Sequence, residues 1–268
     1  ALSTNWFIAT VTKISVNHES AVITALIMFF LIMPQGNVLD TWPLALATAI
    51  AVLSKFILVY KKQHLFNPAA FGLAALGFAG IHASSWWVAN PILFIPLLMG
   101  GILVVMKVRK WPMILSFVAA SFVLYIVDVF AYGDPLAPAV PIFFISWPIL
   151  FLVFYMLTEP FTTPAMKNQQ ILYATIVAFL AMSPLASTFF SFTPELALVM
   201  ASAVMLPARL SQKLFLSYES KRLIAKDVYE FVFKKPEGFT FRAGQYLEWM
   251  LPQESADKRG IRRYFSIA

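Results

Sequence analysis

Eight long apolar runs, separated by short polar connections, dominate the first 213 residues of the chain. A helix of about 20 residues crosses a hydrocarbon core of about 30 Å at about 1.5 Å per residue. We therefore expect a mainly α-helical membrane protein with about eight transmembrane helices. The expected spans are residues 18–33, 43–60, 68–82, 90–106, 111–130, 139–157, 170–187 and 193–210.

The composition excludes an ordinary soluble globular protein. Only 12% of the residues are charged and 60% are hydrophobic, whereas soluble domains carry about 25% charged residues. The chain has no cysteine, which excludes disulfides, thiolate-bound zinc and Cys-ligated iron–sulfur clusters. The sequence offers no metal site of its own.

The basic residues predict one orientation in the membrane. The connections after the first, third, fifth and seventh runs contain no Lys or Arg. Lys and Arg near the other ends of the spans are typical of cytoplasmic loops. We therefore expect both termini in the cytoplasm. As the location we expect the bacterial inner membrane. The residues on this side are Lys13, Lys61, Lys62, Lys107, Arg109, Lys110, Lys167, Arg209 and Lys213.

Residues 214–268 have a different pattern, in which apolar and polar residues alternate and "PEG" provides a turn. Alternation of this kind indicates antiparallel strands. We expect two domains: a transmembrane domain in residues 1–213, followed in residues 214–268 by the first half of an antiparallel β-barrel.

The order "KDVYEFVFKKPEGFTFRAGQYLEWMLP", followed by "RRYFS", resembles the first half of a ferredoxin-NADP reductase-type FAD-binding barrel. The resemblance implies an FAD site at Arg263, Tyr264, Phe265 and Ser266. Arg263 would bind the diphosphate, Phe265 would stack on the isoalloxazine, and Ser266 would reach flavin N5. The remaining strands and a nicotinamide domain would lie beyond residue 268. The alternative is an ordinary basic and aromatic strand with no ligand.

Two segments of the helical part, "SKFILVYKKQHLFNPAAFGLAALG" (54–77) and "LTEPFTTPAMKNQQ" (157–170), support a second resemblance. They resemble the family of membrane proteins that comprises the B-type subunits of sodium-pumping NADH:quinone reductase and the D-type subunits of Rnf complexes. The family attaches FMN covalently to a Ser/Thr-Gly-Ala-Thr motif. The nearest stretch here, "SPLAST" (183–188), lacks the glycine. The resemblance therefore implies a non-covalent FMN or riboflavin in the membrane domain.

Polar residues at the two Pro-broken segments are the candidates for that membrane flavin. Each has a structural alternative. Lys55 can extend its amine to the surface, Asn67 can cap a helix, and the hydroxyls can satisfy freed backbone groups. The candidates are Lys55, Asn67, Thr158, Glu159, Thr162 and Thr163.

The histidines argue against haem. A ferric-reductase-type membrane domain needs paired histidines inside two helices, whereas His18, His64 and His82 lie at expected helix ends or loops. Asp128 and Asp134 lie near one end of the fifth run. They are either a solvated rim or a proton relay.

The resemblances together predict a membrane flavin oxidoreductase, with no nucleic-acid partner. Electrons from NAD(P)H would pass through barrel FAD to a flavin or acceptor in the membrane domain, and from there to a quinone or another acceptor. Flavin suits this task because it converts two-electron into one-electron chemistry. Two alternatives stay open: a small-solute or ion transporter regulated by a flavin domain, and a membrane anchor for a soluble reductase.

Overall fold

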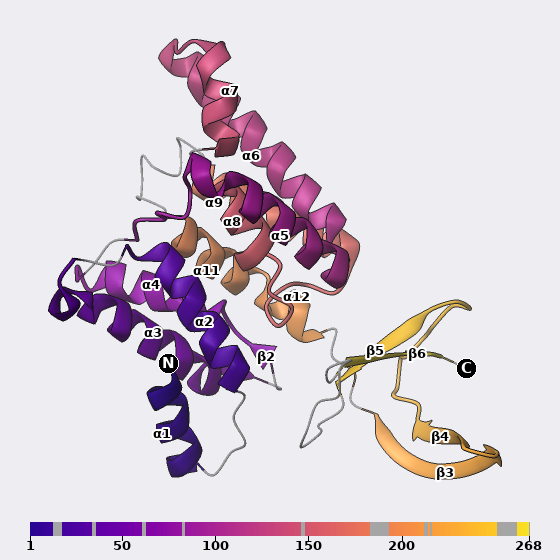
Figure 1. Ribbon diagram of the computed structural model, residues 1–268. Coiled ribbons are helices and arrows are strands. Elements are labelled where there is room, and N and C mark those ends of the chain that lie inside the picture. The colour runs from indigo at the N-terminus through magenta and orange to yellow at the C-terminus, as the bar shows by residue number, and fades with distance from the viewer. Residues whose placement is uncertain are drawn as a thin grey trace. The chain divides into compact units, whose positions relative to one another are not determined.

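The structure is a computed structural model, shown in Figure 1. It divides into two compact units, Ala1–Gln212 and Lys213–Ala268, which are described separately. The residues it describes are 1–12, 18–33, 36–60, 63–81, 84–145, 148–182, 193–211, 214, 216–250 and 262–267.

The first unit is helical, apart from a small antiparallel hairpin of β1 (Val59–Tyr60) and β2 (Gln63–His64). Short 3-10 turns, η1 (Val38–Thr41) and η2 (Pro91–Leu93), lead into α3 and α5, and a π-helical turn, η3 (Leu152–Met156), follows α8. The described α-helices are α1 (Leu2–Thr12), α2 (His18–Leu31), α3 (Trp42–Ile57), α4 (Pro68–Phe78), α5 (Phe94–Val108), α6 (Trp111–Tyr132), α7 (Leu136–Ile145), α8 (Ile149–Phe151), α9 (Lys167–Met182), α11 (Pro194–Val204) and α12 (Leu206–Ser211).

The prediction of eight transmembrane helices is wrong for the part of the chain that the structure describes. Three helical segments, Leu39–Ile57, Pro91–Val108 and Trp111–Tyr132, are long and apolar enough to cross a membrane. A fourth results if α7 and the segment Ile149–Met156, which meet at a 43° bend, count as one span. These helices indicate an integral membrane protein.

Local breaks make the other apolar helices too short. Helices α4 and α11 contain 11 residues each, about 16 Å at about 1.5 Å per residue, or half of a hydrocarbon core. Both begin with a capping side chain and a proline, Asn67-Pro68 and Thr193-Pro194. The apolar pattern therefore predicted helices correctly and their lengths incorrectly.

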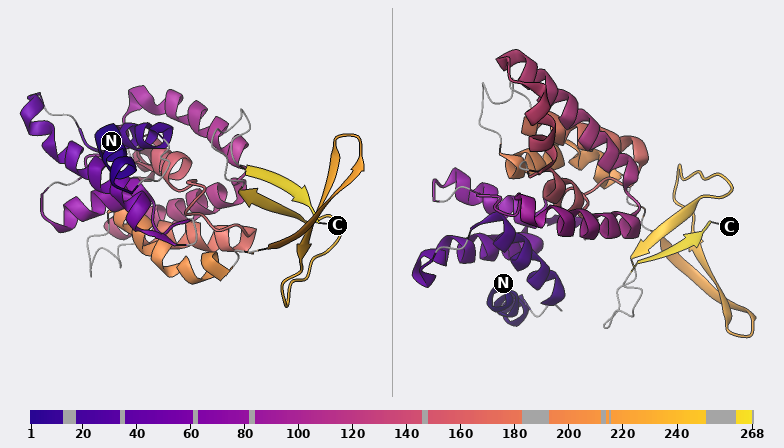
Figure 2. Two further views of the ribbon diagram at one scale, coloured as in Figure 1. Left: turned by 90° about the horizontal axis from the view of Figure 1, so that it is seen from below. Right: turned by 45° about the horizontal axis from the view of Figure 1, so that its top comes forward.

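The core of the first unit lies between one pair of consecutive helices, α3 and α4, and helices that are more distant in sequence. Helices α3 and α4 run side by side, as do α6 and α9, and α11 packs against both α4 and α9 (Figure 1, Figure 2). Phe117, Met156, Tyr173 and Leu198 are fully buried there. By contrast, α5 exposes a stripe of large apolar side chains, a face suited to lipid. The exposed residues are Ile95, Met99, Leu103 and Met106.

The second unit consists of two antiparallel hairpins. Strand β3 (Ser217–Ala225) pairs with β4 (Val228–Lys234), and β5 (Tyr246–Met250) pairs with β6 (Arg262–Ser266). Each pair is a separate two-stranded sheet, so the expected barrel is not formed by the described strands. Two-stranded sheets leave both edges unpaired, and closure requires hydrogen bonds from one pair to the next. The alternating pattern predicted the strands but not their closure.

Candidate functional site

The two Pro-broken segments of the helical unit meet beside α12. The Asn67 amide before α4 donates to the Met156 carbonyl of η3 at 3.0 Å. The Arg209 guanidinium, on α12, donates to the Leu65 carbonyl at 2.7 Å and to the Thr162 carbonyl. Three segments that are far apart in sequence are therefore held together by side-chain bonds to backbone. A π-helical turn such as η3 often marks a functional site.

Four of the predicted flavin-binding side chains bond to nearby backbone. The Asn67 Oδ1 caps α4 by accepting from the Ala70 N–H at 3.0 Å. The three hydroxyls bond to backbone carbonyls within four residues of their own positions, a local arrangement common for Thr at helix breaks. Thr158 donates to the Phe154 carbonyl at 2.6 Å, Thr163 donates to the Glu159 carbonyl at 3.0 Å, and Thr162 contacts the Glu159 carbonyl at 3.4 Å and its Oε2 at 3.3 Å.

Lys55 joins two helices. Its Nζ donates to both the carbonyl and the hydroxyl of Ser20 at 2.8 Å, which links α3 to the first turn of α2. Its positive charge lowers the pKa of both Glu159 and His64.

His64 and Glu159 are the titratable pair of this region. The His64 Nδ1 lies 3.8 Å from the Glu159 Oε1, and the imidazole stacks on Phe161 with ring centroids 5.1 Å apart. Burial, helped by the charge of Lys55, lowers the pKa of His64 to about 4. Burial also raises the pKa of Glu159 to about 7, against the opposing effects of Lys55, the Thr162 hydroxyl and Arg209. Near neutral pH the imidazole is therefore uncharged and Glu159 can exchange a proton.

Three buried polar atoms in this region have no hydrogen-bond partner among the described residues: the Gln63 Oε1, the His64 Nδ1 and the Arg209 Nε. A buried polar atom without a partner costs about 1–3 kcal/mol, and most native ones are satisfied by protein, water or a ligand. His64 contacts Glu159, Glu159 contacts Thr162, and Thr162 contacts Arg209; we call these four residues, with Gln63 next to His64 on β2, the polar cluster. Its unsatisfied atoms make it the candidate site.

Sequence reasoning missed Gln63, His64 and Arg209 as site residues. It placed His64 in a loop and counted Arg209 only as a charge at a span end. The segment 54–77, which supported the family resemblance, contains Gln63 and His64. However, nothing in the sequence indicates that Arg209 meets Leu65, 144 residues away.

The pH dependence of stability separates the two titratable residues. The folded state keeps a proton on Glu159 that the unfolded state releases as the pH rises from about 4.5 to 7, so this residue lowers stability with rising pH. The unfolded state binds a proton on His64 that the folded state excludes as the pH falls from 6.5 to about 4, so this residue lowers stability with falling pH. The two effects oppose each other in the wild type.

We expect each single substitution to reveal the pH dependence of stability that the other residue causes. The unfolding temperature of Glu159→Gln should fall as the pH is lowered below 6.5. That of His64→Gln should rise as the pH is lowered from about 7 towards 4.5. Thermal unfolding of the detergent-solubilised chain across this range measures both. Parallel pH profiles for the two variants would contradict the assignment.

The four predicted FAD-binding residues lie together on β6. Strand alternation directs Arg263 and Phe265 to one face and Tyr264 and Ser266 to the other. Arg263 pairs in register with Trp249 on β5, and the Phe265 ring lies 6.0 Å from that of Trp249. The Phe265 and Tyr264 side chains are exposed. Arg263, expected at the diphosphate, and Phe265, expected to stack on the flavin, thus share one face of the strand. Ser266, expected at flavin N5, lies on the other face.

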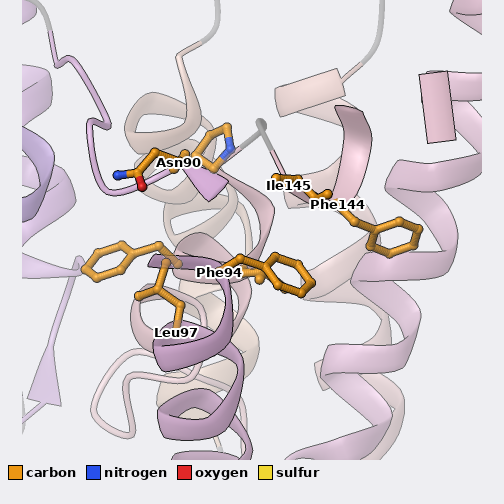
Figure 3. A pocket seen from close by; sticks show the side chains of 9 residues that line it. Asn90, Phe94, Leu97, Phe144 and Ile145 are labelled. Carbon is orange, nitrogen blue, oxygen red and sulfur yellow. The ribbon is translucent and has the colours of Figure 1, made fainter. Parts of the chain in front are cut away.

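Other predicted features lie apart from the cluster. Asp128 is half-buried near the end of α6, and Asp134 is exposed after it. The "SPLAST" stretch lies outside the described residues. A pocket between α5 and the bend after α7 is lined by Asn90, Phe94, Leu97, Phe144 and Ile145, among others (Figure 3). Its volume of about 10 Å³ is the space of one water molecule, too small for a flavin ring.

The comparisons with known proteins give a partial match. No protein family model matches the chain. A segment of 91 residues, 34% of this chain, is 35% identical to the D-type subunit of the ion-translocating oxidoreductase complex of Methanosarcina acetivorans. The matched segment spans 28% of the length of that curated relative. In this third of its length, the chain is thus similar to a subunit of an ion-translocating oxidoreductase complex.

Proposed function

We propose that this chain is a membrane subunit of an electron-transfer complex and that its polar cluster binds a non-covalent FMN or riboflavin. The main observation behind the proposal is the set of buried, unpartnered polar atoms on Gln63, His64 and Arg209. The partial similarity to an oxidoreductase complex subunit supports the same class of activity.

The side chains of the cluster fit the chemistry of an isoalloxazine. Its pyrimidine ring offers both donors and acceptors, which the Arg209 Nε–H and the His64 nitrogen can complement. The parallel pair of His64 and Phe161 provides a flat aromatic surface. The guanidinium would also favour the anion of a reduced flavin or a flavin phosphate.

Within this proposal each residue of the cluster has a defined task. A bound flavin would supply the exchange between two-electron and one-electron transfer. Arg209 fixes the two broken segments by its bonds to Leu65 and Thr162. Glu159, whose raised pKa lies at about 7, holds or releases a proton at its Oε1 near neutral pH.

The second unit is proposed to bring the electron donor. Under this proposal Arg263, Tyr264, Phe265 and Ser266 contact FAD, which is reduced by NAD(P)H, and the membrane flavin passes electrons on to a quinone or another acceptor. The adjacent placement of Arg263 and Phe265 on one face of β6 supports this part of the proposal. Under the expected orientation, both flavin sites would face the cytoplasm.

The double variant Gln63→Leu/His64→Phe tests the membrane site. It removes two unpartnered polar atoms and keeps an aromatic ring next to Phe161. We expect binding of riboflavin or FMN to weaken at least tenfold, about 1.4 kcal/mol, while the unfolding temperature stays equal or rises. Equilibrium dialysis and quenching of flavin fluorescence, with the full chain in detergent, measure binding without any turnover.

Asp134→Asn is the control, because Asp134 is exposed and lies beyond the end of α6. It should bind flavin like the wild type. A wild-type chain that binds neither flavin, or a double variant that binds as tightly as the wild type, would refute the proposed site.

A small-solute or ion transporter is the second candidate function. The observation that favours it is the pair of short helices α4 and α11, because interrupted helices build the central sites of many transporters. The two functions differ in a simple measurement. A purified chain that has no flavin absorbance, but that carries a solute into liposomes, would favour transport.

A further inference from the structure

The turn that joins α5 to α6 (Figure 1) carries basic side chains between two long apolar helices. The segments Pro91–Val108 and Trp111–Tyr132 are both long and apolar enough to cross a membrane. Only Arg109 and Lys110 separate them, and Lys107 lies in the last turn of α5. Because two consecutive spans are joined by two residues, this turn has to lie at a membrane surface, at the level of the lipid headgroups.

Arg109 has a backbone conformation that usually selects glycine. Its φ of 55° and ψ of 41° are left-handed, and its N–H donates to the Val105 carbonyl at 2.7 Å where α5 ends. Helices commonly end with glycine in this conformation, because a Cβ is disfavoured there. The local backbone thus gives no reason for an arginine at this position. A role for the guanidinium has to be sought in what it contacts outside the turn.

Two of the basic side chains are exposed and have no acidic partner. Lys107 and Arg109 are exposed, and no carboxylate in the described part of the chain forms an ion pair with either of them. The sequence contains no Asp or Glu in residues 41–127 or 160–194, which include α5, most of α6 and all of α9. Exposed basic residues next to a membrane span attract the headgroups of anionic lipids.

Lys110 fixes the position of the turn against the broken segment before α9. Its Nζ donates to the Pro164 carbonyl at 3.1 Å, and α6 packs along α9. Lys167, three residues after Pro164, begins α9 and is exposed. The starts of α6 and α9 therefore lie side by side, and their N-terminal dipoles add to the positive potential of the basic side chains.

Large apolar side chains next to the turn favour a lipid over a soluble anion. They belong to the last two turns of α5 and the first two turns of α6, and an indole ring among them is typical of a membrane–water interface. Exposed apolar groups beside exposed cations can contact the acyl chains and the headgroup of the same lipid molecule. The exposed apolar residues are Leu103, Met106, Trp111 and Leu115.

We propose that the α5–α6 turn binds the phosphate headgroup of an anionic phospholipid. The planar fork of the Arg109 guanidinium suits a bidentate contact with the phosphate, and Lys107 supplies a second positive charge. The exposed apolar side chains on both sides of the turn contact the acyl chains. The proposal does not depend on the flavin site, so each can fail without the other.

Unfolding temperatures of the full chain in neutral detergent test the site, with phosphatidylglycerol or phosphatidylcholine added to the micelles. We expect a saturable rise with phosphatidylglycerol only, because a ligand that binds only the folded state stabilises it. Without lipid, Arg109→Gly should unfold at the wild-type temperature or above it, because glycine fits the left-handed backbone. The half-saturating amount of phosphatidylglycerol should nevertheless increase about fivefold, the effect of one basic side chain near an anionic surface.

Two double variants with the same change in net charge separate a local site from a general charge effect. Lys107→Gln/Arg109→Gly removes both exposed charges of the turn and should lose most of the response to phosphatidylglycerol. Lys226→Gln/Lys235→Gln removes two exposed charges from the second unit and should respond like the wild type. Equal losses in the two double variants would overturn the proposal, because net charge would then explain the binding.

Three other results would also overturn it. A rise of the same size with phosphatidylcholine would show a general effect of lipid. A rise with inorganic phosphate alone would show a site for soluble anions. An undiminished response in Lys107→Gln/Arg109→Gly would place the lipid elsewhere. If Arg109→Gly fails to fold, Lys107→Gln alone tests the site, because its side chain is exposed at the end of α5. Flavin binding, measured on the same samples, decides the proposed function separately.

Discussion

Replacing Gly72 with valine is expected to lower the free energy of unfolding of the helical unit by about 3 kcal/mol, the upper end of the range for overpacked cores. Gly72 lies where α4 crosses α3. A Cβ at this position would lie 2.6 Å from the Ala47 carbonyl oxygen and 3.0 Å from the Ala51 Cβ. Both contacts are with helix backbone or its first side-chain atom, which cannot rotate away. The helices must separate, and the buried Ala47 and Ala51 lose their packing.

The same substitution at Gly77 provides a matched control within α4. A Cβ there meets no atom within 4 Å among the described residues. Because valine is a better helix former than glycine, Gly77→Val should change stability by no more than about 0.5 kcal/mol. Unfolding of both variants in mixed micelles, followed by circular dichroism, gives the comparison. Equal losses at the two positions would mean that α3 and α4 do not pack closely at Gly72.

Arg209→Met is expected to cost about 3 kcal/mol and to loosen the polar cluster. The side chain is only 4% exposed and donates to the Leu65 and Thr162 carbonyls. Methionine fills a similar volume but leaves both carbonyls without this donor, and bonds to a charged donor contribute about 1.5–3 kcal/mol each. The segments before α4 and after η3 then keep the Asn67–Met156 bond but lose the second side chain that joins them. We therefore also expect flavin binding to decrease.

Two further variants identify the cause of that loss. Arg209→Lys keeps the charge but has one amine in place of the fork, so it should recover only part of the stability. Lys167→Met removes an exposed basic residue at the start of α9 and should leave the unfolding free energy within about 0.5 kcal/mol of the wild type. If Lys167→Met were as destabilising as Arg209→Met, net charge and not the bonds of Arg209 would explain the effect. Denaturant titration measures all three variants.

The sequence predicted element type well and element length poorly. Apolar residues in 43–60 and 111–130 predicted helices that the structure contains as α3 and α6. The range 68–82 became the 11-residue α4. In 139–157 the helix is broken into α7, α8 and the π-helical η3. Hydropathy averages over a window, so it does not register where one proline or one cap ends a helix.

In the second unit, too, the sequence predicted the type of element but not how the elements assemble. Alternating residues predicted strands, which the structure contains as β3 to β6. The expected barrel depended on hydrogen bonds between strands of different hairpins, which no local pattern encodes. In the described residues these bonds are absent and two separate sheets result. Ring contacts such as that of Phe233 with Trp249, at 4.7 Å, are what connect the hairpins.

The sequence by itself indicated that the helices lie in an apolar environment, because long runs without charges are stable only in lipid or in a large core. It also marked "FNP" and "TEPFTTP" as interrupted polar segments. Only the tertiary structure decided which polar atoms there are already paired and which are not. Asn67 and Thr158 bond to backbone, whereas His64 and Arg209 keep an unsatisfied nitrogen. The physical reason is that burial and much of the pairing arise from contacts between segments far apart in sequence, such as Asn67 with Met156 and Ser84 with Glu195. A periodic pattern carries only information about neighbours along the chain.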